Sequence, residues 1–293
     1  MKIRLAASSG FCFGVRRAIQ MALEARENGD EVCTLGELIH NPPIVQELRD
    51  KGIEVCPSAE SIQNKVVVIR SHGIGKQELE TLQQGGNRII DATCPYVKRA
   101  QEIVSSMADY PVLILGDANH PEVMGMLSYG NEQTRVVQED TDLSEERWQK
   151  LCVVSQTTQR LDSLQNLVRK LLPQTLELRV FNTICLATTQ RQDAALALAK
   201  AADLMIVIGG RNSANTRMLQ QLCSAQTRSV QIETEAELSA ELFDNVKFVG
   251  ITAGASTPAE MILKVYNKIK EINRDADTAT CSEEIPLFKE ESC

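Results

Sequence analysis

Three cysteines lie at turns where an apolar run gives way to small or turn-forming residues. Cys12 stands in "GFCFGV", Cys94 in "DATCP" and Cys185 in "FNTICLATT", at nearly even intervals along the 293-residue chain. A thiolate at such a strand-to-helix turn is stabilised by helix N–H groups, which suits a ligand to a metal or an iron–sulfur cluster. For each cysteine alone, burial as a small hydrophobe is the better explanation, whereas for the evenly spaced trio shared ligation is an equally good one.

The other cysteines give weaker signals. Cys33, Cys56 and Cys152 lie in or beside apolar strands and Cys223 lies in a helical pattern, which favours a packing role. Three thiolates would leave a zinc site short of its usual four ligands, but a four-iron cluster held by three would keep one iron open as a Lewis acid. The sequence contains no C-x-x-C, which argues against zinc ribbons and ferredoxin-type carriers.

The three histidines of the chain all lie in loops beside proline or glycine, at His40, His72 and His120. Each alone is explained as a turn or capping residue, whereas together they could bind a metal or form a cationic pocket for phosphate oxygens. Glu122 follows at a predicted helix start, where the helix dipole is sufficient reason for a carboxylate. A proton-donor role would also require a raised pKa.

Short β-branched runs alternate with amphipathic helical patterns along the chain, which predicts parallel sheets covered by helices. The strand candidates are residues 3–7, 66–70, 88–90, 112–115, 152–154, 178–181, 204–208 and 247–252. Six of them lead into small polar loops, which read "SSGFCFG", "RSHGIG", "GDANHPE", "SQTTQ", "GGRNSAN" and "AGASTP". Because ligands bind at the carboxyl ends of parallel strands, we expect several of these loops to face a common polar cavity.

The cysteine spacing divides the chain into similar pieces. Residues 1–12 hold an N-terminal strand and the first cysteine, followed by α/β units at 13–94, 95–183 and 184–270. This division predicts an α/β protein of three small units in a pseudo-threefold arrangement. Residues 271–293 are charged and weakly patterned, and we expect a C-terminal tail there, in which Cys281 and Cys293 receive no role.

Composition excludes several classes of function. The net charge of −8 offers no broad attraction to nucleic acid or anionic lipid, and no apolar stretch approaches the roughly 20 residues that span a bilayer. The first ten residues, "MKIRLAASSG", lack the apolar core of a secretory signal. We therefore expect a cytoplasmic protein with reduced thiols, no nucleic-acid partner and no membrane partner.

The ordered motifs resemble a known family over residues 3 to 270. They read "GFCFGVRRAI", "IHNP", "SHGIG", "DATCP", "HPEV", "SQTT", "ATTQRQ", "NSAN" and "TAGASTP". This order is similar to that of the LytB-type 4-hydroxy-3-methylbut-2-enyl diphosphate reductases, which end the non-mevalonate (MEP) isoprenoid pathway. The resemblance implies three α/β units around a central 4Fe-4S cluster.

The resemblance also implies roles for individual residues. It makes Cys12, Cys94 and Cys185 the ligands of a 4Fe-4S cluster with one open iron, and Glu122 the proton source. Thr157 resembles the catalytic threonine near the substrate hydroxyl, where it also contributes to substrate binding. The implied diphosphate pocket contains His40, His72, His120, Ser213, Asn215 and Ser256.

The implied reaction is the reductive removal of the substrate hydroxyl, which gives isopentenyl and dimethylallyl diphosphate. The implied partners are a small diphosphate substrate and an electron donor such as ferredoxin or flavodoxin. Ala214 departs from the "NSSN" of many relatives, so one hydroxyl contact to the diphosphate is lost or replaced. Two rival functions remain open, a zinc hydrolase that uses the three histidines and an iron–sulfur redox sensor without a diphosphate pocket.

Overall fold

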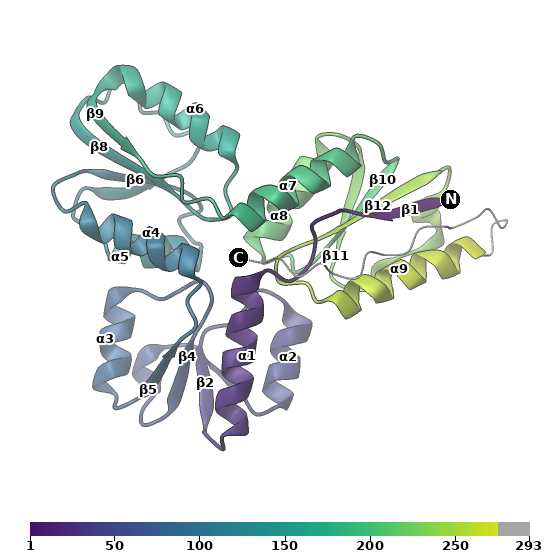
Figure 1. Ribbon diagram of the computed structural model, residues 1–293, viewed down its shortest axis with the longest axis horizontal. Helices are drawn as coiled ribbons and strands as arrows, with labels where there is room; N and C mark the ends of the chain where they lie inside the picture. Colours follow the sequence, from purple (N-terminus) through teal and green to yellow (C-terminus); the bar gives the residue numbers. More distant parts are fainter. Residues whose placement is uncertain (275–293) are drawn as a thin grey trace. The chain divides into compact units, whose positions relative to one another are not determined.

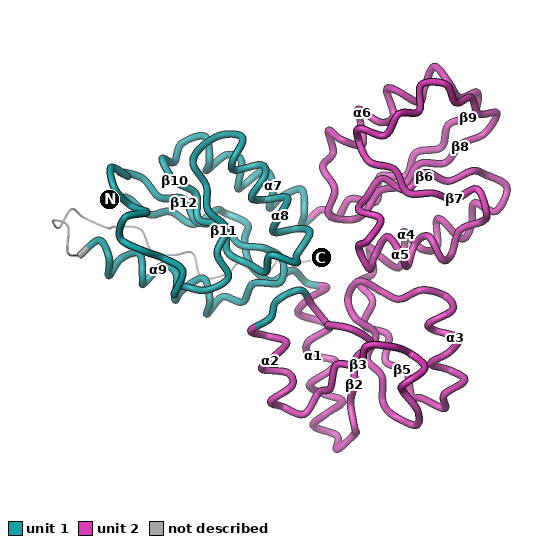
Figure 2. The backbone as a smooth tube through the Cα atoms, turned by 180° about the vertical axis from the view of Figure 1, so that it is seen from behind, with its two compact units in different colours: residues 1–13, 40–42, 187–293 teal, residues 14–39, 43–186 magenta. Residues whose placement is uncertain are grey.

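The computed structural model describes residues 1–274, which divide into two compact units (Figure 2). Unit 1 comprises residues 1–13, 40–42 and 187–274, and unit 2 comprises residues 14–39 and 43–186. The described residues form three four-stranded sheets, and every pair of neighbouring strands is parallel. The prediction of three α/β units with mainly parallel sheets is confirmed.

Unit 1 is built on one sheet with strand order β1-β12-β10-β11. Its strands are β1 (Lys2–Leu5), β10 (Leu204–Ile208), β11 (Arg228–Ile232) and β12 (Phe248–Ala253), and its helices are α7 (Leu186–Ala199), α8 (Ala214–Ser224) and α9 (Ala259–Arg274). Alternate residues of β10 pack on opposite faces: Ile206 contacts the core under α9, whereas Met205 and Val207 contact the core under α7 and α8 (Figure 1). Both faces of this sheet are therefore covered, which explains the uninterrupted apolar sequence of β10.

The first sheet of unit 2 has the order β3-β2-β4-β5. Its strands are β2 (Val32–Leu35), β3 (Glu54–Cys56), β4 (Val66–Ile69) and β5 (Arg88–Asp91), and its helices are α1 (Phe13–Glu27), α2 (Pro42–Asp50) and α3 (Lys76–Gln84). Cys33 is fully buried in the core of this sheet among Leu35, Val67 and Leu82. The packing role that the sequence suggested for Cys33 fits this position.

The second sheet of unit 2 has the order β7-β6-β8-β9. Its strands are β6 (Val112–Leu115), β7 (Thr134–Val137), β8 (Trp148–Ser155) and β9 (Thr175–Val180), and its helices are α4 (Pro95–Ser106), α5 (Pro121–Ser128) and α6 (Leu161–Leu171). Helices α4 and α5 bury Ala100 and Val123 on one face, and α6 buries Leu167 on the other (Figure 1). Cys152 lies inside this core, fully buried.

Prolines fix the starts of two helices that carry candidate site residues. Pro95 and Pro121 occupy the first positions of α4 and α5, where the missing N–H of proline costs nothing. The residues directly before them, Cys94 and His120, are therefore the N-caps of these helices. In both cases the candidate site residue stands at the N-terminal end of a helix, where the backbone N–H groups are exposed.

The remaining described elements are short 3₁₀ turns at Ala59–Ser61, Leu172–Gln174, Glu235–Glu237 and Ala240–Phe243. Among residues 1–274, no helix combines the length and the apolar character that crossing a membrane requires. Most of the predicted C-terminal tail, with Cys281 and Cys293, lies outside the described residues.

Candidate active site

In unit 1, the three loops that follow β1, β10 and β12 are joined at one edge of the sheet. The backbone N–H of Gly10 donates to the carbonyl of Ala253 at 3.3 Å, and the N–H of Cys12 donates to Ala255 at 3.1 Å. Gly254 in turn donates to the carbonyl of Ile208, at the end of β10, at 2.8 Å. Gly10 has a φ of +84°, a conformation that favours glycine. The turn that holds Cys12 is therefore fixed by the neighbouring strand end.

The start of α8 in unit 1 is suited to binding an anion. The Oγ of Ser213 is the N-cap and accepts a hydrogen bond from the N–H of Thr216 at 3.4 Å, so its own proton is left to donate. Asn215 is only 5% exposed, and neither amide atom of its side chain has a hydrogen-bond partner within residues 1–274. A buried amide without partners is costly, which is the usual mark of a group that pairs with a ligand.

Ser256 is held beside His40 within the same unit. The Nδ2 of Asn41 donates to the carbonyl of Ser256 at 2.7 Å, and the Oγ of Ser256 donates to the carbonyl of His40 at 3.0 Å. The structure therefore brings two candidate diphosphate ligands together through Asn41, which the sequence analysis did not single out. For Ser256 to donate to a phosphate oxygen, its hydroxyl must turn away from His40.

In unit 2, Cys94 stands between the loop after β4 and the start of α4. Its N–H donates to the carbonyl of Ser71 in "RSHGIG" at 3.0 Å. Gly14 of α1 leaves room for its sulfur, because a Cβ atom at that position would lie 2.8 Å from the Sγ of Cys94. The first turn of α1 therefore depends on glycine for the close approach of this thiol.

Cys185, directly before α7, is fixed by the loop that follows β8. Its N–H donates to the carbonyl of Thr157 at 2.9 Å. Two residues earlier, Thr183 Oγ1 accepts from the N–H of Ser155 at 2.9 Å. The third cysteine is thus joined by one hydrogen bond to the candidate catalytic threonine.

Glu122 and Thr157 form a direct, buried pair in unit 2. The N–H of Thr157 donates to Oε1 of Glu122 at 2.6 Å, and the Thr157 hydroxyl donates to Oε2 at 2.9 Å. The side chain of Glu122 is 2% exposed. Burial raises the pKa of Glu122 to about 7, and the two hydrogen bonds from Thr157 oppose this rise. A carboxyl group with this pKa can hold a proton and release it near neutral pH.

His120 connects this pair to a second histidine. Its Nδ1 accepts from the N–H of Glu122 at 3.2 Å, and its ring meets that of His72 edge to face with centroids 5.5 Å apart. One ring nitrogen of each histidine lies within 4.8 Å of the other. Because Nδ1 of His120 is an acceptor, a neutral ring carries its proton on Nε2, which is then a donor for an anion.

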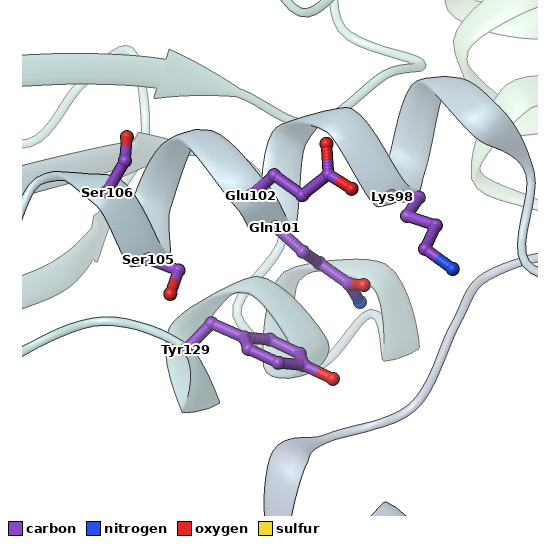
Figure 3. A pocket seen from close by; sticks show the side chains of 6 residues that line it. All are labelled: Lys98, Gln101, Glu102, Ser105, Ser106 and Tyr129. Carbon is purple, nitrogen blue, oxygen red and sulfur yellow. The ribbon is translucent and has the colours of Figure 1, made fainter.

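Two cavities lie along α4, and none of the predicted site residues lines either. One, of about 330 Å³, is bordered by side chains of α4 and by Tyr129 after α5 (Figure 3). The other, of about 270 Å³, includes Thr93 and Pro95, the two neighbours of Cys94. Its lining carries charges of both signs.

Sequence reasoning missed several buried or half-buried polar residues near the predicted site. Gln156 precedes Thr157, and its Oε1 accepts from the N–H of Asp117 at 3.1 Å. Arg17 and Arg191 donate to backbone carbonyls close to the cysteines. "SQTT" and "ATTQRQ" contain two of these residues, but only three-dimensional contacts distinguish them from ordinary loop and helix residues.

The fold has three parallel sheets covered by helices, with cysteines at strand-to-helix turns and a buried acid at the start of a helix. This combination is typical of the class of α/β enzymes whose polar site lies at the carboxyl ends of strands. Residues 3–270 match the family described as LytB protein, so the chain belongs to the LytB family. The family resemblance seen in the sequence motifs is confirmed.

Its relatives include the 4-hydroxy-3-methylbut-2-enyl diphosphate reductase of Geobacter sulfurreducens, which is 48% identical over 93% of this chain and 98% of the relative. The reductase of Trichlorobacter lovleyi is 46% identical over 93% of this chain and 99% of its own. Both relatives are named as reductases, and the chain is accordingly an oxidoreductase.

Two solved structures share the fold. One is the structure of (E)-4-hydroxy-3-methyl-but-2-enyl diphosphate reductase, the terminal enzyme of the non-mevalonate pathway, with a TM-score of 0.66, 40% identity, and coverage of 92% of this chain and 99% of that one. The other is the E-1-hydroxy-2-methyl-but-2-enyl-4-diphosphate reductase of Plasmodium falciparum, with a TM-score of 0.83, 25% identity, and coverage of 98% and 94%.

Proposed function

We propose that this chain reduces 4-hydroxy-3-methylbut-2-enyl diphosphate to isopentenyl diphosphate and dimethylallyl diphosphate, as the last step of the MEP pathway. The substrate takes up two electrons and two protons and releases its hydroxyl group as water. The electrons come from a small carrier such as ferredoxin or flavodoxin. The observation that carries the proposal is the buried Glu122–Thr157 pair, because Thr157 also accepts a hydrogen bond from the N–H of Cys185.

The three cysteines fit a 4Fe-4S cluster by their chemistry. Cys12, Cys94 and Cys185 are half-buried, and each lies directly before a helix or at its N-cap. Helix N–H groups favour the thiolate form that ligates iron. The space that Gly14 leaves for the sulfur of Cys94 further supports a role beyond packing. Bound there, such a cluster would supply electrons and an open iron that polarises the C–O bond of the substrate.

The proton for the departing hydroxyl comes from Glu122. Its pKa of about 7 leaves a substantial fraction of the carboxyl protonated at neutral pH. Thr157 fixes both oxygens of the carboxyl, and its hydroxyl can donate or accept as the proton moves. Burial excludes the water that would otherwise exchange with this proton.

The diphosphate is bound by hydrogen-bond donors rather than by a broad positive surface. Ser213 and Asn215 at the start of α8 offer a hydroxyl proton and an amide, next to helix N–H groups. Ser256 and the rings of His40, His72 and His120 complete the proposed set of ligands. Ala214 contributes no hydroxyl, so its contact to the diphosphate is limited to its backbone.

The test is anaerobic turnover of synthetic substrate with dithionite-reduced methyl viologen, with products separated by chromatography. We expect both isomeric diphosphates, together with water, from wild-type protein. Release of inorganic phosphate from the substrate, without consumption of reductant and dependent on added zinc, would instead support the zinc hydrolase. Cluster reduction without substrate binding would support the redox sensor.

A further inference from the structure

The loop between β10 and α8 in unit 1 starts with two buried glycines, Gly209 and Gly210. Gly209 has a φ of +146°, and a Cβ atom there would lie 2.6 Å from Oγ1 of Thr216 and 2.9 Å from Oγ1 of Thr257. A Cβ atom on Gly210 would lie 2.8 Å from the carbonyl oxygen of His40. Both positions therefore require glycine, and the turn lies against the backbone of a proposed diphosphate ligand.

The carbonyl groups of this turn are held by a glutamine on the neighbouring edge strand. Nε2 of Gln231 on β11 donates to the carbonyl of Gly209 at 3.1 Å and to that of Gly210 at 3.2 Å. Both partners are acceptors, so only the NH2 group of the side chain can make these contacts, and both of its protons are used. Val230 packs on the core under α9, so the alternation along β11 places Gln231 on the opposite face, which α8 covers.

The next peptide along the loop has further hydrogen bonds. The carbonyl of Gly210 also accepts from the N–H of Ser213, the N-cap of α8, at 3.0 Å. The N–H of Arg211 donates to Oε1 of Glu233, which directly follows β11, at 2.8 Å. Within residues 1–274, by contrast, the carbonyl of Gly209 accepts its only hydrogen bond from Gln231. The Gly209–Gly210 peptide is therefore the one whose orientation depends on the glutamine.

The orientation of this peptide decides which of its dipole ends faces away from β11. In a trans peptide the carbonyl and the N–H point to opposite sides, so a carbonyl held toward Gln231 directs the N–H of Gly210 away from it. Glycine on both sides of the peptide means that no Cβ atom resists its rotation. Without Gln231 the buried carbonyl would lose its donor, and rotation would place an oxygen where the N–H had been. An oxygen there disfavours an anion beside the loop, because the partial charge has changed sign.

We propose that Gln231 is a positioning residue for the proposed diphosphate site, which keeps the two carbonyl oxygens of the Gly209–Gly210 turn away from the bound anion. This inference rests on the proposed function. The turn leads directly to Ser213 and Asn215, the proposed ligands at the start of α8. Gln231 acts through the backbone and takes no part in proton or electron transfer. Its loss should therefore weaken substrate binding and leave the chemical step intact.

The test compares cluster-loaded wild type with Gln231→Met, in which the side chain keeps its length but has no donor. Anaerobic steady-state kinetics with dithionite-reduced methyl viologen gives KM and kcat, and calorimetry gives the Kd of inorganic diphosphate. We expect KM and this Kd to rise about tenfold while kcat stays within about twofold of wild type. Gln231→Asn keeps the amide but is one methylene shorter, so it should show the same changes and serves if Gln231→Met does not fold.

Gln220→Met is the matched control. Nε2 of Gln220 on α8 donates to the carbonyl of Ser229 on β11 at 3.1 Å and to Oγ of Ser224 at 3.2 Å, in the C-terminal half of the helix. This glutamine therefore also joins α8 to β11, but away from the Gly209–Gly210 turn. Its replacement should lower the unfolding temperature as Gln231→Met does, while KM and the Kd of inorganic diphosphate stay within about twofold of wild type.

Unchanged KM and Kd in the Gln231 variants would overturn the inference, and so would an equal rise in Gln220→Met, because the effect would then come from general loosening of the sheet. A fall in kcat with unchanged KM would place the effect in the chemical step and overturn it as well. Failure of both Gln231 variants to fold would make Gln231 a structural residue. Wild-type protein that binds neither substrate nor inorganic diphosphate would refute the proposed function itself, whereas active wild type with unaltered variants would refute only this inference.

Discussion

At the scale of single residues, the proposed chemistry is concentrated in the contact between Glu122 and Thr157. The sequence placed a glutamate at a helix start, where the dipole favours ionisation. The structure shows a stronger opposing effect, because burial raises the pKa of Glu122 to about 7. Desolvation outweighs both hydrogen bonds from Thr157. The environment of this residue, and not its position on a helix, makes it a candidate proton donor.

Glu122→Gln should separate binding from chemistry. The amide has nearly the same volume and can keep a hydrogen bond to Thr157, so substrate affinity and iron content should change little. Because the amide cannot deliver a proton, turnover should fall by about 10²–10⁴-fold. Anaerobic steady-state kinetics paired with direct substrate binding measures both effects. Near-normal turnover would remove Glu122 from the mechanism.

The raised pKa also predicts a pH dependence of activity. In the proposed mechanism the protonated carboxyl is the active form, so turnover should be constant below about pH 7 and fall about tenfold per pH unit well above it. Thr157→Val should move the fall in turnover to higher pH, because it removes a hydrogen bond that lowers the pKa of Glu122. A turnover profile that rises through pH 7 would contradict the assignment.

The raised pKa of Glu122 also makes the stability of the folded protein depend on pH. The pKa of Glu122 in the folded state lies above its ordinary value of 4.5, so folding takes up a proton between pH 4.5 and about 7. Its contribution to stability is complete below pH 4.5 and is lost as the pH rises through 7, by about 3 kcal/mol in total. Denaturant unfolding of wild type and Glu122→Gln should therefore diverge with rising pH, with wild type becoming relatively less stable. Parallel pH curves would count against a buried, titrating carboxyl.

At the scale of elements, strand ends and helix starts place the candidate ligands. Pro95 and Pro121 each put a candidate residue at an N-cap, and Ser213 caps α8. The motif positions were visible in the sequence because Gly, Pro, Ser and Asn mark turns. The contacts of Asn41, Arg17 and Arg191 were not, because each depends on a partner far along the chain.

The burial of Asn215 at the start of α8 predicts that its replacement will affect protein stability and diphosphate binding differently. Its buried amide has no hydrogen-bond partner within the described residues, so Asn215→Ala should leave the protein as stable as wild type or more stable. The same change should weaken diphosphate binding about tenfold, in line with one lost donor. Asn87→Ala is the matched control, because its Nδ2 donates to the carbonyls of Ile62 and Leu82.

Thermal unfolding of the ligand-free chain and calorimetric binding of substrate measure these two effects. The control should unfold at a lower temperature and bind substrate normally once folded. A loss of stability in Asn215→Ala that equals the loss in Asn87→Ala would show that the amide of Asn215 is a structural group.

The edge strands show where sequence patterns lose information. The candidates at 112–115 and 204–208 coincide with β6 and β10, which are buried on both faces and entirely apolar. Strands β2, β3, β7 and β11 were absent from the candidates. Three of them lie at sheet edges, where "EVC", "TRVV" and "RSVQI" mix polar and apolar residues, whereas β2, which reads "VCTL", is a buried central strand of only four residues. A half-buried edge strand of this length resembles a loop in composition.

At the scale of the whole molecule, three sheets of the same kind carry the six loops. The near-even cysteine spacing indicated this repetition although the side chains show no clear repeat. The assignment of a cluster, by contrast, came from the family motifs, because three isolated cysteines fit core packing equally well. Cys33, Cys152 and Cys223, all fully buried, illustrate that alternative within the same chain.

Residues beyond Arg274 should be dispensable for the reaction. Their sequence is charged and weakly patterned, so little apolar surface is available for burial against the rest of the chain. A chain that ends at Arg274 should keep its iron and most of its turnover. Loss of iron from the shortened chain would give Cys281 or Cys293 a role that the motifs do not suggest.

Iron and acid-labile sulfide analysis of anaerobically purified protein tests the central claim most directly. We expect brown protein that bleaches with dithionite and holds about four irons and four sulfides per chain. Replacement of Cys12, Cys94 or Cys185 by serine should remove the cluster and the activity, whereas Cys33→Ser and Cys223→Ser should keep both. Colourless wild-type protein that carries stoichiometric zinc, or full iron content in the Cys94→Ser variant, would contradict the account.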